Sequence, residues 1–571
     1  MMRVMPMGPT GPMGSTGPTG PSRPATTPTV DVIVVGAGVA GLACAADLVA
    51  AGLRVTVLEA SDAPGGRMRS DHRDGFVLDR GFQVFNPYYP QVRKRIRAEG
   101  LDLHDFAPGF LLHGPKHRTR IANPLADRQM LKELRNGLPG SLRDLAALSA
   151  LSARDVCLPT RRLKDAPDES AYTSLRAAGL SAGFIDRALR PFFAGVFLEP
   201  DLTTSSRMLH LVWRSMLRGR ATLPAQGIGA VPEQLARRLP PGTLRLETPV
   251  AAVTDEGVVL VGGEAIAAGA VVVATGPGAA TALIGPALAA PEFNQPDSDA
   301  PHSNSPTSNH PTLTPPTATP PGTDQATLAA QLDDEQSPPA PPSATSLSTD
   351  QATLASPNAS PLGNEQSPLA PPSAASLSTG QPGYAPPSAS RPALVSPIAA
   401  SPSTDLPGIA PASAGSASSS QHGSAVPMRS VTTYYHAAPH SPLREPIIIV
   451  DQAMRILNTA VLTDVCPAYS ADGRALISTS VLGSSGDHAG LSLVEVLGEV
   501  YGVAAEGWEF LGSYDIGEAL PVMVPPWPLS RSARVGVGRY VCGDYRATGS
   551  VQGAMASGAR AAREVVADLG S

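Results

Sequence analysis

Residues 30–70 read VDVIVVGAGVAGLACAADLVAAGLRVTVLEASDAPGGRMRS, and the rest of the chain is best understood from this stretch. The apolar run 32–35 has the length of a buried strand, and the glycines after it match the pattern G-x-G-x-x-G. A helix-spaced apolar segment follows and stops at Gly52, which is typical of a helix C-terminus. A second apolar strand, 55–58, completes a βαβ unit, the context in which this glycine pattern predicts dinucleotide binding.

Each glycine of the turn has its own physical task. Gly36 allows the tight turn, Gly38 lets the backbone approach a pyrophosphate because it has no Cβ, and Gly41 lets helix and strand pack closely. The first turn of the helix, with Val39 and Ala40, offers free N–H groups and a partial positive charge to the diphosphate.

An acid ends the second strand. Glu59 lies about 20 residues after the glycine turn, where a carboxylate accepts hydrogen bonds from a ribose 2′-OH, and Ala60 follows it. An acid at this place repels a 2′-phosphate, so we expect the site not to take NADP.

A second glycine turn follows, with Gly65 and Gly66 directly before Arg67. Two glycines make a mobile turn, and the arginine can deliver a bidentate, charge-assisted contact to a diphosphate. The combined pattern G-x-G-x-x-G, then E, then G-G-R resembles the N-terminal signature of the flavin amine oxidase superfamily. That group includes amine oxidases, protoporphyrinogen oxidases and carotenoid (phytoene) desaturases, so the resemblance implies FAD as the cofactor.

The resemblance also implies the fold class, which is α/β. We expect a Rossmann-like FAD-binding domain of the glutathione-reductase type, an interleaved α+β substrate domain and a long disordered insertion. The predicted boundaries are a leader at 1–29, an FAD-binding domain at 30–90, 221–285 and 515–571, a substrate domain at 91–220 and 428–514, and the insertion at 286–427.

Composition restricts the classes of function. The chain has 571 residues, which is too long for a single ordinary core, and its formal charge of −6 leaves no polybasic footprint for nucleic acid. Four scattered cysteines without a C-x-x-C pair favour a reducing compartment over a disulfide framework. Neither a run of 18 apolar residues nor a secretory signal is visible. We therefore expect a cytoplasmic protein, with peripheral contact to a membrane as one option.

Two segments have a composition that differs from the remainder. Residues 1–29 carry glycines with a collagen-like period of three over five triplets, too few for a stable triple helix, so we predict a disordered leader. Residues 286–427 are rich in Pro, Ser, Thr and Ala, and EQSPPAPPSATSLST at 335–349 recurs as EQSPLAPPSAASLST at 365–379. Such a segment cannot bury enough apolar surface to offset its ordering entropy, so we predict a disordered insertion.

The segment 74–90, DGFVLDRGFQVFNPYYP, predicts a strand at Phe76 and a turn that ends at Gly81. By the resemblance, Gly81, Phe82 and Gln83 line the flavin ring, although a plain core strand and turn explains them equally well. Beyond it, spacing predicts four helices: 91–100, 140–152, 170–178 and 182–193. The long apolar face within 191–219 belongs either to an apolar substrate cavity or to the core.

The region 221–285 returns to the character of a nucleotide-binding domain. A glycine-rich turn precedes a helix, and short strands follow, one of them predicted at 246–253. In the superfamily such a strand gives backbone contacts to the adenine, which points to Val250. The strand 271–275 ends in A-T-G near the cofactor, by the same resemblance. From Arg429 onward, β-branched segments predict the substrate-domain sheet, with a helix near 492–500 and a strand near 510–514.

The last motif lies in 539–566, RYVCGDYRATGSVQGAMASGARAAREV. A short buried strand at 540–542 precedes Gly543 and Asp544, and a helix begins near Gln552. The resemblance implies that Asp544 binds the ribityl chain of the flavin. It also implies that the backbone at Val551 and Gln552 meets the pyrimidine edge, where the helix N-terminus stabilises the charge of the reduced ring.

Catalytic residues do not stand out in the sequence. We see no Ser/His/Asp pattern and no metal-ligand pattern, and the 11 histidines are dispersed. Amine oxidases of the superfamily usually carry a lysine near the flavin N5, yet this chain has no lysine after Lys164. They also carry an aromatic residue just before the final helix, where this chain has 548–550, Thr-Gly-Ser, and Tyr545 is the nearest ring.

These departures favour the desaturase branch. We expect an FAD-dependent oxidoreductase that removes a hydride from an apolar, isoprenoid- or carotenoid-like substrate and passes the electrons to oxygen or a quinone, since no NAD(P) motif is present. One alternative is an amine oxidase or protoporphyrinogen-type oxidase. The other is a flavin-binding scaffold without catalysis, whose low-complexity segments recruit partners.

Overall fold

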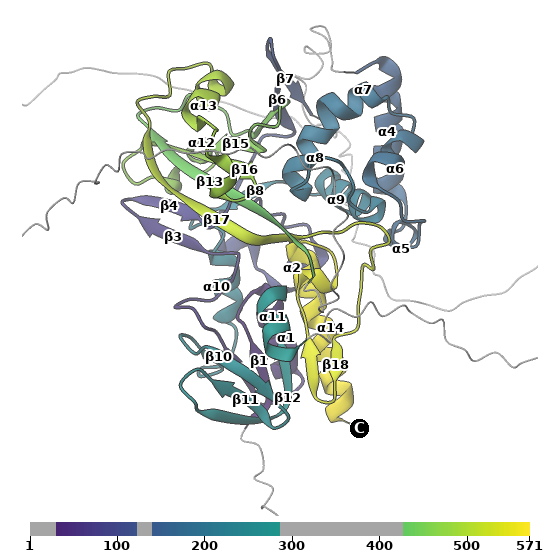
Figure 1. Cartoon of the computed structure of the whole chain (residues 1–571), viewed down its shortest axis with the longest axis vertical. Helices are drawn as coiled ribbons and strands as arrows, with labels where there is room; N and C mark the ends of the chain where they lie inside the picture. Colours follow the sequence, from purple (N-terminus) through teal and green to yellow (C-terminus); the bar gives the residue numbers. More distant parts are fainter. Residues whose placement is uncertain (1–29, 123–139, 286–425, 571) are drawn as a thin grey trace, which may run out of the picture. The chain divides into compact units, whose positions relative to one another are not determined.

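The computed structural model describes residues 30–122, 140–285 and 426–570. The predicted leader and nearly all of the predicted insertion, 286–425, lie outside the described residues. Within those ranges the chain builds two large sheets, two small antiparallel strand pairs and a group of helices (Figure 1). The predicted domain boundaries stay a prediction.

The first large sheet contains the βαβ unit predicted from the sequence. β1 lies between β12 and β2, and all three strands are parallel, as are β2 with β9 and β12 with β19. Its strands are β1 (Val30–Val35), β2 (Val55–Leu58), β9 (Leu244–Arg245), β10 (Val250–Thr254), β11 (Gly257–Leu260), β12 (Ala265–Val273), β18 (Arg534–Gly536) and β19 (Arg539–Val541). Parallel strands covered on both faces read as continuous apolar runs, which explains the sequence of β1 and β2.

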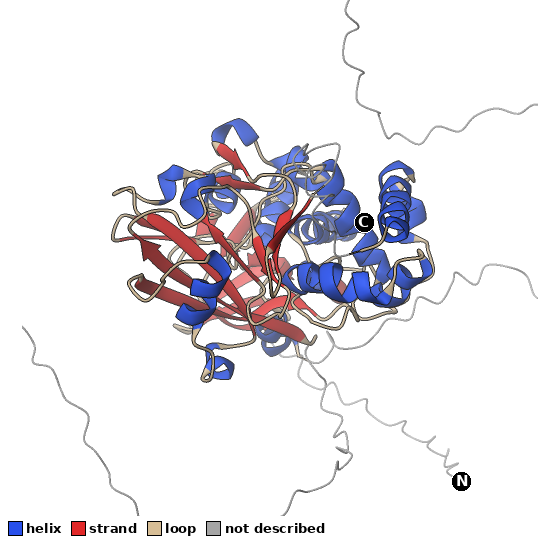
Figure 2. Cartoon of the chain, turned by 90° about the horizontal axis from the view of Figure 1, so that it is seen from above, coloured by secondary structure: helices blue, strands red, loops and turns tan. Residues whose placement is uncertain are grey.

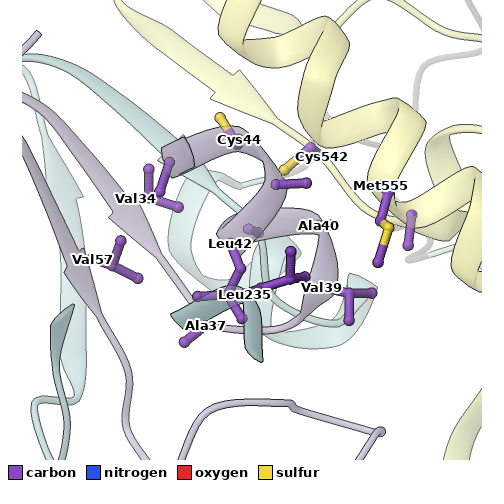
Figure 3. Close-up of a cluster of buried hydrophobic side chains, with 14 of the residues drawn as sticks. Val34, Ala37, Val39, Ala40, Leu42, Cys44, Val57, Leu235, Cys542 and Met555 are labelled. Carbon is purple, nitrogen blue, oxygen red and sulfur yellow. The ribbon is translucent and has the colours of Figure 1, made fainter. Parts of the chain in front are cut away.

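Helices pack on both faces of this sheet. α1 (Val39–Ala50), α10 (Ala230–Ala236) and α14 (Val551–Leu569) enclose a core with β1 and β2 (Figure 3). α2 (Pro90–Arg95) packs beside α14, and α11 (Pro277–Ile284) belongs to the apolar cluster on the other face. Cys542 is fully buried in the core that Figure 3 shows, as its strand position predicts.

Close packing of α1 against α14 joins the two ends of the chain. A Cβ at Gly558 of α14 would lie 2.1 Å from the carbonyl oxygen of Ala40 in α1. A glycine is therefore required at the crossing point, and it lets the C-terminal helix lie directly on the helix that follows the glycine turn.

The second large sheet has the order β17, β13, β16, β15, β14, β6, β7. Its strands are β6 (Phe110–His113), β7 (Arg118–Ile121), β13 (Met428–Ala438), β14 (Ile449–Asp451), β15 (Asn458–Val461), β16 (Ala475–Leu482) and β17 (Glu509–Pro521), with α12 (Leu462–Val465) and α13 (Leu493–Tyr501) beside them. Two smaller pairs complete the strands: β3 (Ser70–Arg73) with β4 (Phe76–Asp79), and β5 (Leu103–Asp105) with β8 (Thr222–Pro224).

The helical group lies between β7 and β8 in the sequence, and its members are among the helices that Figure 2 draws in blue. It consists of α4 (Leu142–Cys157), α5 (Thr160–Lys164), α6 (Ala171–Ala177), α7 (Ala182–Phe184), α8 (Arg190–Phe197) and α9 (Ser206–Arg218). Met208 of α9 is buried in their common core, whereas Met216 of the same helix is 40% exposed. Within the described residues no helix is both long and apolar enough to cross a membrane.

Three secondary-structure predictions need correction. The helix predicted at 91–100 ends at Arg95 as α2, because Ile96 and Arg97 have an extended backbone, and only a 3₁₀ turn at Ala98–Gly100 follows. The strand predicted at 246–253 begins at Val250, because Glu247 has a positive φ of 50° and Pro249 cannot donate to a sheet, so the chain bends there. The helix predicted at 182–193 is interrupted by a π-helical turn at Ile185–Leu189 and then continues as α8 to Phe197. Pro191, in the first turn of α8, has no N–H group to donate to the preceding turn, and this favours an interruption of the regular helix there.

Candidate functional site

The glycine turn between β1 and α1 leaves space for a ligand at one glycine and none at another. A Cβ added to Gly38 would meet no protein atom within 4 Å, whereas one added to Gly41 would lie 2.1 Å from the carbonyl oxygen of Gly36. Gly36 itself has a φ of 103°. Gly41 therefore serves the fold, and Gly38 leaves backbone open to an approaching molecule.

Glu59 is held beside this turn. One carboxylate oxygen accepts a hydrogen bond from the N–H of Ala37 at 2.7 Å, and the other accepts from the N–H of Ser61 at 3.0 Å. The side chain is 8% exposed, and Ala60 next to it is exposed. Each oxygen keeps acceptor capacity, so the carboxylate is fixed in orientation and still able to bind ribose hydroxyls.

The two glycine turns lie against each other. Gly65 forms a bridge with Gly38 and donates its N–H to the carbonyl oxygen of Ala37 at 2.9 Å. Gly66 has a φ of 59°, and a Cβ there would lie 3.6 Å from the Cα of Gly38. The two glycine turns that the sequence predicts to bind a diphosphate are therefore in direct contact with each other.

Arg67 and Asp544, which come from opposite ends of the chain, form an ion pair. Nη2 of Arg67 lies 2.6 Å from Oδ1 of Asp544, and Nη1 donates to the carbonyl oxygen of Ala519 at 2.7 Å. Asp544 is 4% exposed. Burial would lower the pKa of Arg67, but the carboxylates of Asp544 and Glu518 more than offset this effect and raise it.

The segment predicted to line the flavin ring contacts the Gly-Gly-Arg turn and the second sheet. Gln83 donates from Nε2 to the carbonyl oxygen of Arg67 at 2.6 Å, and the N–H of Phe82 donates to Oγ1 of Thr433 at 3.2 Å. A Cβ at Gly81 would lie 3.4 Å from the side chain of Ile516. These contacts place the segment between the Gly-Gly-Arg turn and β13 with β17.

The C-terminal motif is organised around the start of α14. Ser550 caps the helix by accepting from the N–H of Gly553 at 3.0 Å, which leaves the first N–H groups, at Val551 and Gln552, for a ligand. Oε1 of Gln552 accepts from the N–H of Gln91 at 2.8 Å. The N–H of Gly543 donates to Oγ of Ser557, a helix residue that the sequence does not single out.

Val250 lies at the start of β10 and is partly buried against the sheet. It is connected to the site by its neighbour Thr248, whose N–H donates to the carbonyl oxygen of Glu59 at 2.8 Å. Hydrogen bonds and the Gly38–Gly65 bridge thus link the predicted residues around Glu59, the two glycine turns, Gln83 and Asp544.

Asp79 is a buried carboxyl group that the sequence analysis did not select. Its side chain is 1% exposed and accepts from the hydroxyl of Ser70 at 2.5 Å, the N–H of Ile228 at 2.9 Å and the hydroxyl of Tyr469 at 3.0 Å. The hydroxyl of Tyr435 donates to its backbone carbonyl. Asp79 therefore connects the Gly-Gly-Arg segment with the second sheet, and burial raises its pKa to about 6.

This raised pKa predicts a pH-dependent contribution to stability. The native carboxyl group holds its proton more tightly than the unfolded one, so its contribution is full below about pH 4 and is lost as the pH rises through about 6. Two pKa units correspond to about 3 kcal/mol. In the parent protein the free energy of unfolding should therefore fall between pH 4.5 and pH 7 by the contribution of Asp79. In Asp79→Asn this fall should be absent, and urea unfolding at the two pH values measures the difference.

The exposed Asp74 provides the matched control, since Asp74→Asn changes the same chemical group outside the core. Asp74→Asn should leave the difference between the two pH values as it is in the parent protein. A pH profile of Asp79→Asn that runs parallel to that of the parent protein would contradict the assignment.

A hydrogen-bonded Ser–His–Asp chain, which the sequence did not reveal, joins three helices of the helical group. Nδ1 of His210 lies 2.8 Å from Oδ2 of Asp155, and Nε2 lies 3.0 Å from Oγ of Ser174. Arg154 contacts the same ring and Oδ1 of Asp155. Ser174 lies inside α6, with its N–H bonded to the carbonyl of Ser170, so this N–H is not available to stabilise an oxyanion. The network ties α4, α6 and α9 together.

In the ranges that the structure describes, no group of three or more His, Cys, Asp or Glu side chains is arranged to hold a metal ion.

Comparison with known proteins shows what this chain is similar to. The sequence profile described as "Flavin containing amine oxidoreductase" matches residues 39–309. The chain is 42% identical over 78 residues to coproporphyrinogen III oxidase of Propionibacterium freudenreichii subsp. freudenreichii, which covers 14% of this chain and 15% of that protein. It is 57% identical over 51 residues to hydroxyneurosporene desaturase of Rhodobacter capsulatus, 9% of this chain and 10% of that one. The matches thus span about a seventh or less of these relatives.

Solved structures share the fold over nearly the whole length. Cyclohexylamine oxidase from Brevibacterium oxydans IH-35A superposes with a TM-score of 0.54 at 15% identity, covering 95% of this chain and 100% of that one. Putrescine oxidase superposes with a TM-score of 0.52 at 16% identity, covering 94% and 99%.

The residues present fit FAD as the cofactor. Gly38 leaves open backbone beside the helix N-terminus, Glu59 keeps acceptor capacity for a ribose, and Asp544 lies at the carboxyl end of β19. The glycine turn, the acid and the Gly-Gly-Arg turn lie together, and the profile match begins at residue 39 within the first of these turns, so the chain is similar to the flavin amine oxidase superfamily.

Proposed function

We propose that this protein is an FAD-dependent oxidoreductase that removes a hydride from an apolar, isoprenoid- or carotenoid-like substrate and passes the electrons to oxygen or a quinone. FAD, when bound, supplies the electron sink. In this proposal the parallel strands β19, β12, β1, β2 and β9 are the centre of a Rossmann-like domain of the glutathione-reductase type. The chain's own residues bind the cofactor, and apolar side chains around Gly549 make the proposed substrate site apolar.

The observation that carries the substrate class is the packing around Gly549. A Cβ at this position would lie 3.0 Å from Cδ1 of Leu520 and 3.0 Å from Cε of Met523, and the N–H of Gly549 points at Sδ of Met523 at 3.3 Å. Apolar side chains therefore fill the space beside Gly549, within the segment 548–550 that by the resemblance corresponds to the aromatic position of amine oxidases. A ring at 549 requires both neighbours to move.

Tyr545, the nearest aromatic residue, is directed elsewhere. Its side chain is 1% exposed and packs with Ile33, Val35 and Val273 against the first sheet. A cation needs an accessible ring face, and Tyr545 offers none. Together with the absence of lysine after Lys164, this orientation favours an apolar substrate over an amine.

The proposal predicts which compounds reduce the bound flavin. Under anaerobic conditions, phytoene in detergent micelles should bleach the oxidised flavin band, because an apolar substrate needs no cation-binding group. Putrescine and cyclohexylamine should bleach it at least 100-fold more slowly, because no ring cage stabilises the ammonium group in the site. Stopped-flow absorbance measures this half-reaction without any acceptor.

Free FAD in the same micelles is the control. Rapid bleaching by either amine would support the amine oxidase alternative. Rapid bleaching by coproporphyrinogen III would support the protoporphyrinogen-type oxidase alternative. A flavin that no substrate reduces, although the protein binds it, would favour the non-catalytic scaffold. The location proposed from the sequence is the cytoplasm or a membrane surface, and cell fractionation tests it.

A further inference from the structure

Arg429, a partly buried arginine at the start of β13, forms no ion pair with a carboxylate of the described residues. Its Nε atom is buried and has no hydrogen-bond partner among them, and Nη2 lies 3.5 Å from Oγ1 of Thr203, a long contact. A guanidinium group carries five N–H donors and a permanent positive charge. This side chain can therefore bind an anion without giving up a partner in the described part of the chain.

The two acids whose charges act on Arg429 are engaged elsewhere. Glu199 is buried and accepts from the N–H of Asp201 at 2.8 Å and from the N–H of Thr204 at 3.0 Å. Oδ1 of Asp201 lies 3.7 Å from Nη1 of Arg190. Burial lowers the pKa of Arg429, and the charges of Glu199 and Asp201 offset this effect only in part. The positive charge at position 429 is therefore incompletely compensated.

The pairing of β13 with β17 determines the face of the second sheet on which Arg429 lies. Arg429 pairs with Leu520, and the side chains of directly paired antiparallel residues point to the same face. The register shift between Arg429 and Val431 is taken up by β17, so the alternation along β13 is undisturbed. Residues 429, 431, 433 and 435 therefore share one face.

This face is the one that the predicted flavin-lining segment contacts. The N–H of Phe82 donates to Oγ1 of Thr433 at 3.2 Å. Ile516, the partner of Val431 in β17, is the side chain that a Cβ at Gly81 would approach to 3.4 Å. Arg429 thus lies on the side of the sheet that is turned toward the proposed cofactor site.

Leu520 connects Arg429 with the proposed substrate site. A Cβ at Gly549 would lie 3.0 Å from Cδ1 of Leu520, the residue that pairs with Arg429. The carbonyl oxygen of Met523 accepts from the N–H of Ser205 at 2.7 Å, so the loop before α9 reaches the same place. Arg429 is therefore located between the apolar side chains around Gly549 and this loop.

We propose that Arg429 binds a carboxylate of the substrate, so that the substrate is an apolar molecule with an acid group at one end. Leu520 and Met523 contact its apolar body, and a pair of parallel N–H donors of the guanidinium group takes the two carboxylate oxygens. A charge beside apolar surface costs free energy, and the carboxylate neutralises it. This inference rests on the proposed function and specifies its substrate class.

Retinoic acid and its methyl ester are a matched pair of probes, because they share the polyene and differ in the negative charge. In the flavin-loaded full-length protein at pH 8, retinoic acid should bind about 10-fold to 100-fold more tightly than the ester, the range for a hydrogen bond to a charged group. Quenching of tryptophan fluorescence by the polyene measures both affinities. Arg429→Gln should weaken the binding of the acid alone and remove the preference. Arg429→Lys should keep part of it, since an ammonium group retains the charge without the paired donors.

Arg118→Gln is the matched control, because Arg118 is an exposed arginine of β7, at the other edge of the same sheet. It should leave the preference for the acid as it is in the parent protein. Thermal unfolding without a probe should show Arg429→Gln to be at least as stable as the parent, because the substitution removes a partly buried, incompletely compensated charge. A loss of stability accompanied by weaker binding of the ester would assign Arg429 to the fold and overturn the inference.

Coproporphyrin III and its tetramethyl ester form a second pair, since a tetrapyrrole acid presents the same carboxylate group. A preference for the acid in this pair alone, lost in Arg429→Gln, would keep Arg429 as the carboxylate site and overturn the isoprenoid-like substrate of the proposed function. Equal binding of acid and ester in both pairs, or a preference that survives in Arg429→Gln, would overturn the inference. The proposed function would still stand in that case if phytoene bleaches the flavin.

Discussion

Replacing Gly38 with alanine is expected to weaken FAD binding at least 100-fold while the stability of the apo-protein stays the same. Gly38 has φ of −67° and ψ of 170°, a conformation that alanine adopts without strain, and its Cβ would meet no protein atom within 4 Å. The same Cβ would occupy the space through which a diphosphate approaches the backbone. A 100-fold loss corresponds to about 2.7 kcal/mol of binding free energy.

Calorimetric titration with FAD and thermal unfolding of the apo-protein measure the two quantities separately. Gly262→Ala is the matched control, because a Cβ at Gly262 also meets no protein atom within 4 Å but this residue lies in the turn between β11 and β12. It should change neither quantity. Normal FAD affinity in Gly38→Ala would mean that the cofactor does not approach this turn.

Replacing Gly41 with alanine is expected to have the opposite signature, a loss of stability of about 3 kcal/mol or more. The new Cβ would lie 2.1 Å from the carbonyl oxygen of Gly36 and 3.1 Å from Cβ of Ala274. Backbone cannot yield as a flexible side chain does, so β1, α1 and β12 have to separate. FAD binding falls as a consequence of the damaged fold, and urea unfolding of the apo-protein shows the loss directly.

Gly558→Ala provides a comparison that leaves the glycine turn unaltered. Its Cβ would lie 2.1 Å from the carbonyl oxygen of Ala40, so a similar loss of stability is expected from the forced separation of α1 and α14. If Gly41→Ala and Gly558→Ala were both as stable as the parent protein, the close helix packing described above would be wrong.

Local sequence determined the part of the site that surrounds the glycine turn. The apolar strands, the glycine spacing and the terminal acid all lie within 30–59, and each expresses a short-range requirement of backbone geometry or strand burial. The βαβ unit, the helix end before Gly52 and the C-terminal strand and helix were predictable for this reason. Apolar spacing alone predicted the strand at 246–253 and the helix at 182–193 without regard to Pro249 and Pro191, and both boundaries were wrong.

Roles that depend on distant contacts were decided by the tertiary structure. Arg67 and Asp544 are 477 residues apart, and their pairing requires α14 to pack on α1 and β17 to end beside the glycine turns. The burial of Tyr545 against the first sheet, the hydrogen bonds around Asp79 and the Ser174–His210–Asp155 chain have the same origin. Sequence determined which side chains are able to bind a flavin, because that is a property of residue type and local spacing. Their actual partners were determined by sheet order and helix packing, since a side chain is bound by whatever the fold brings within its reach.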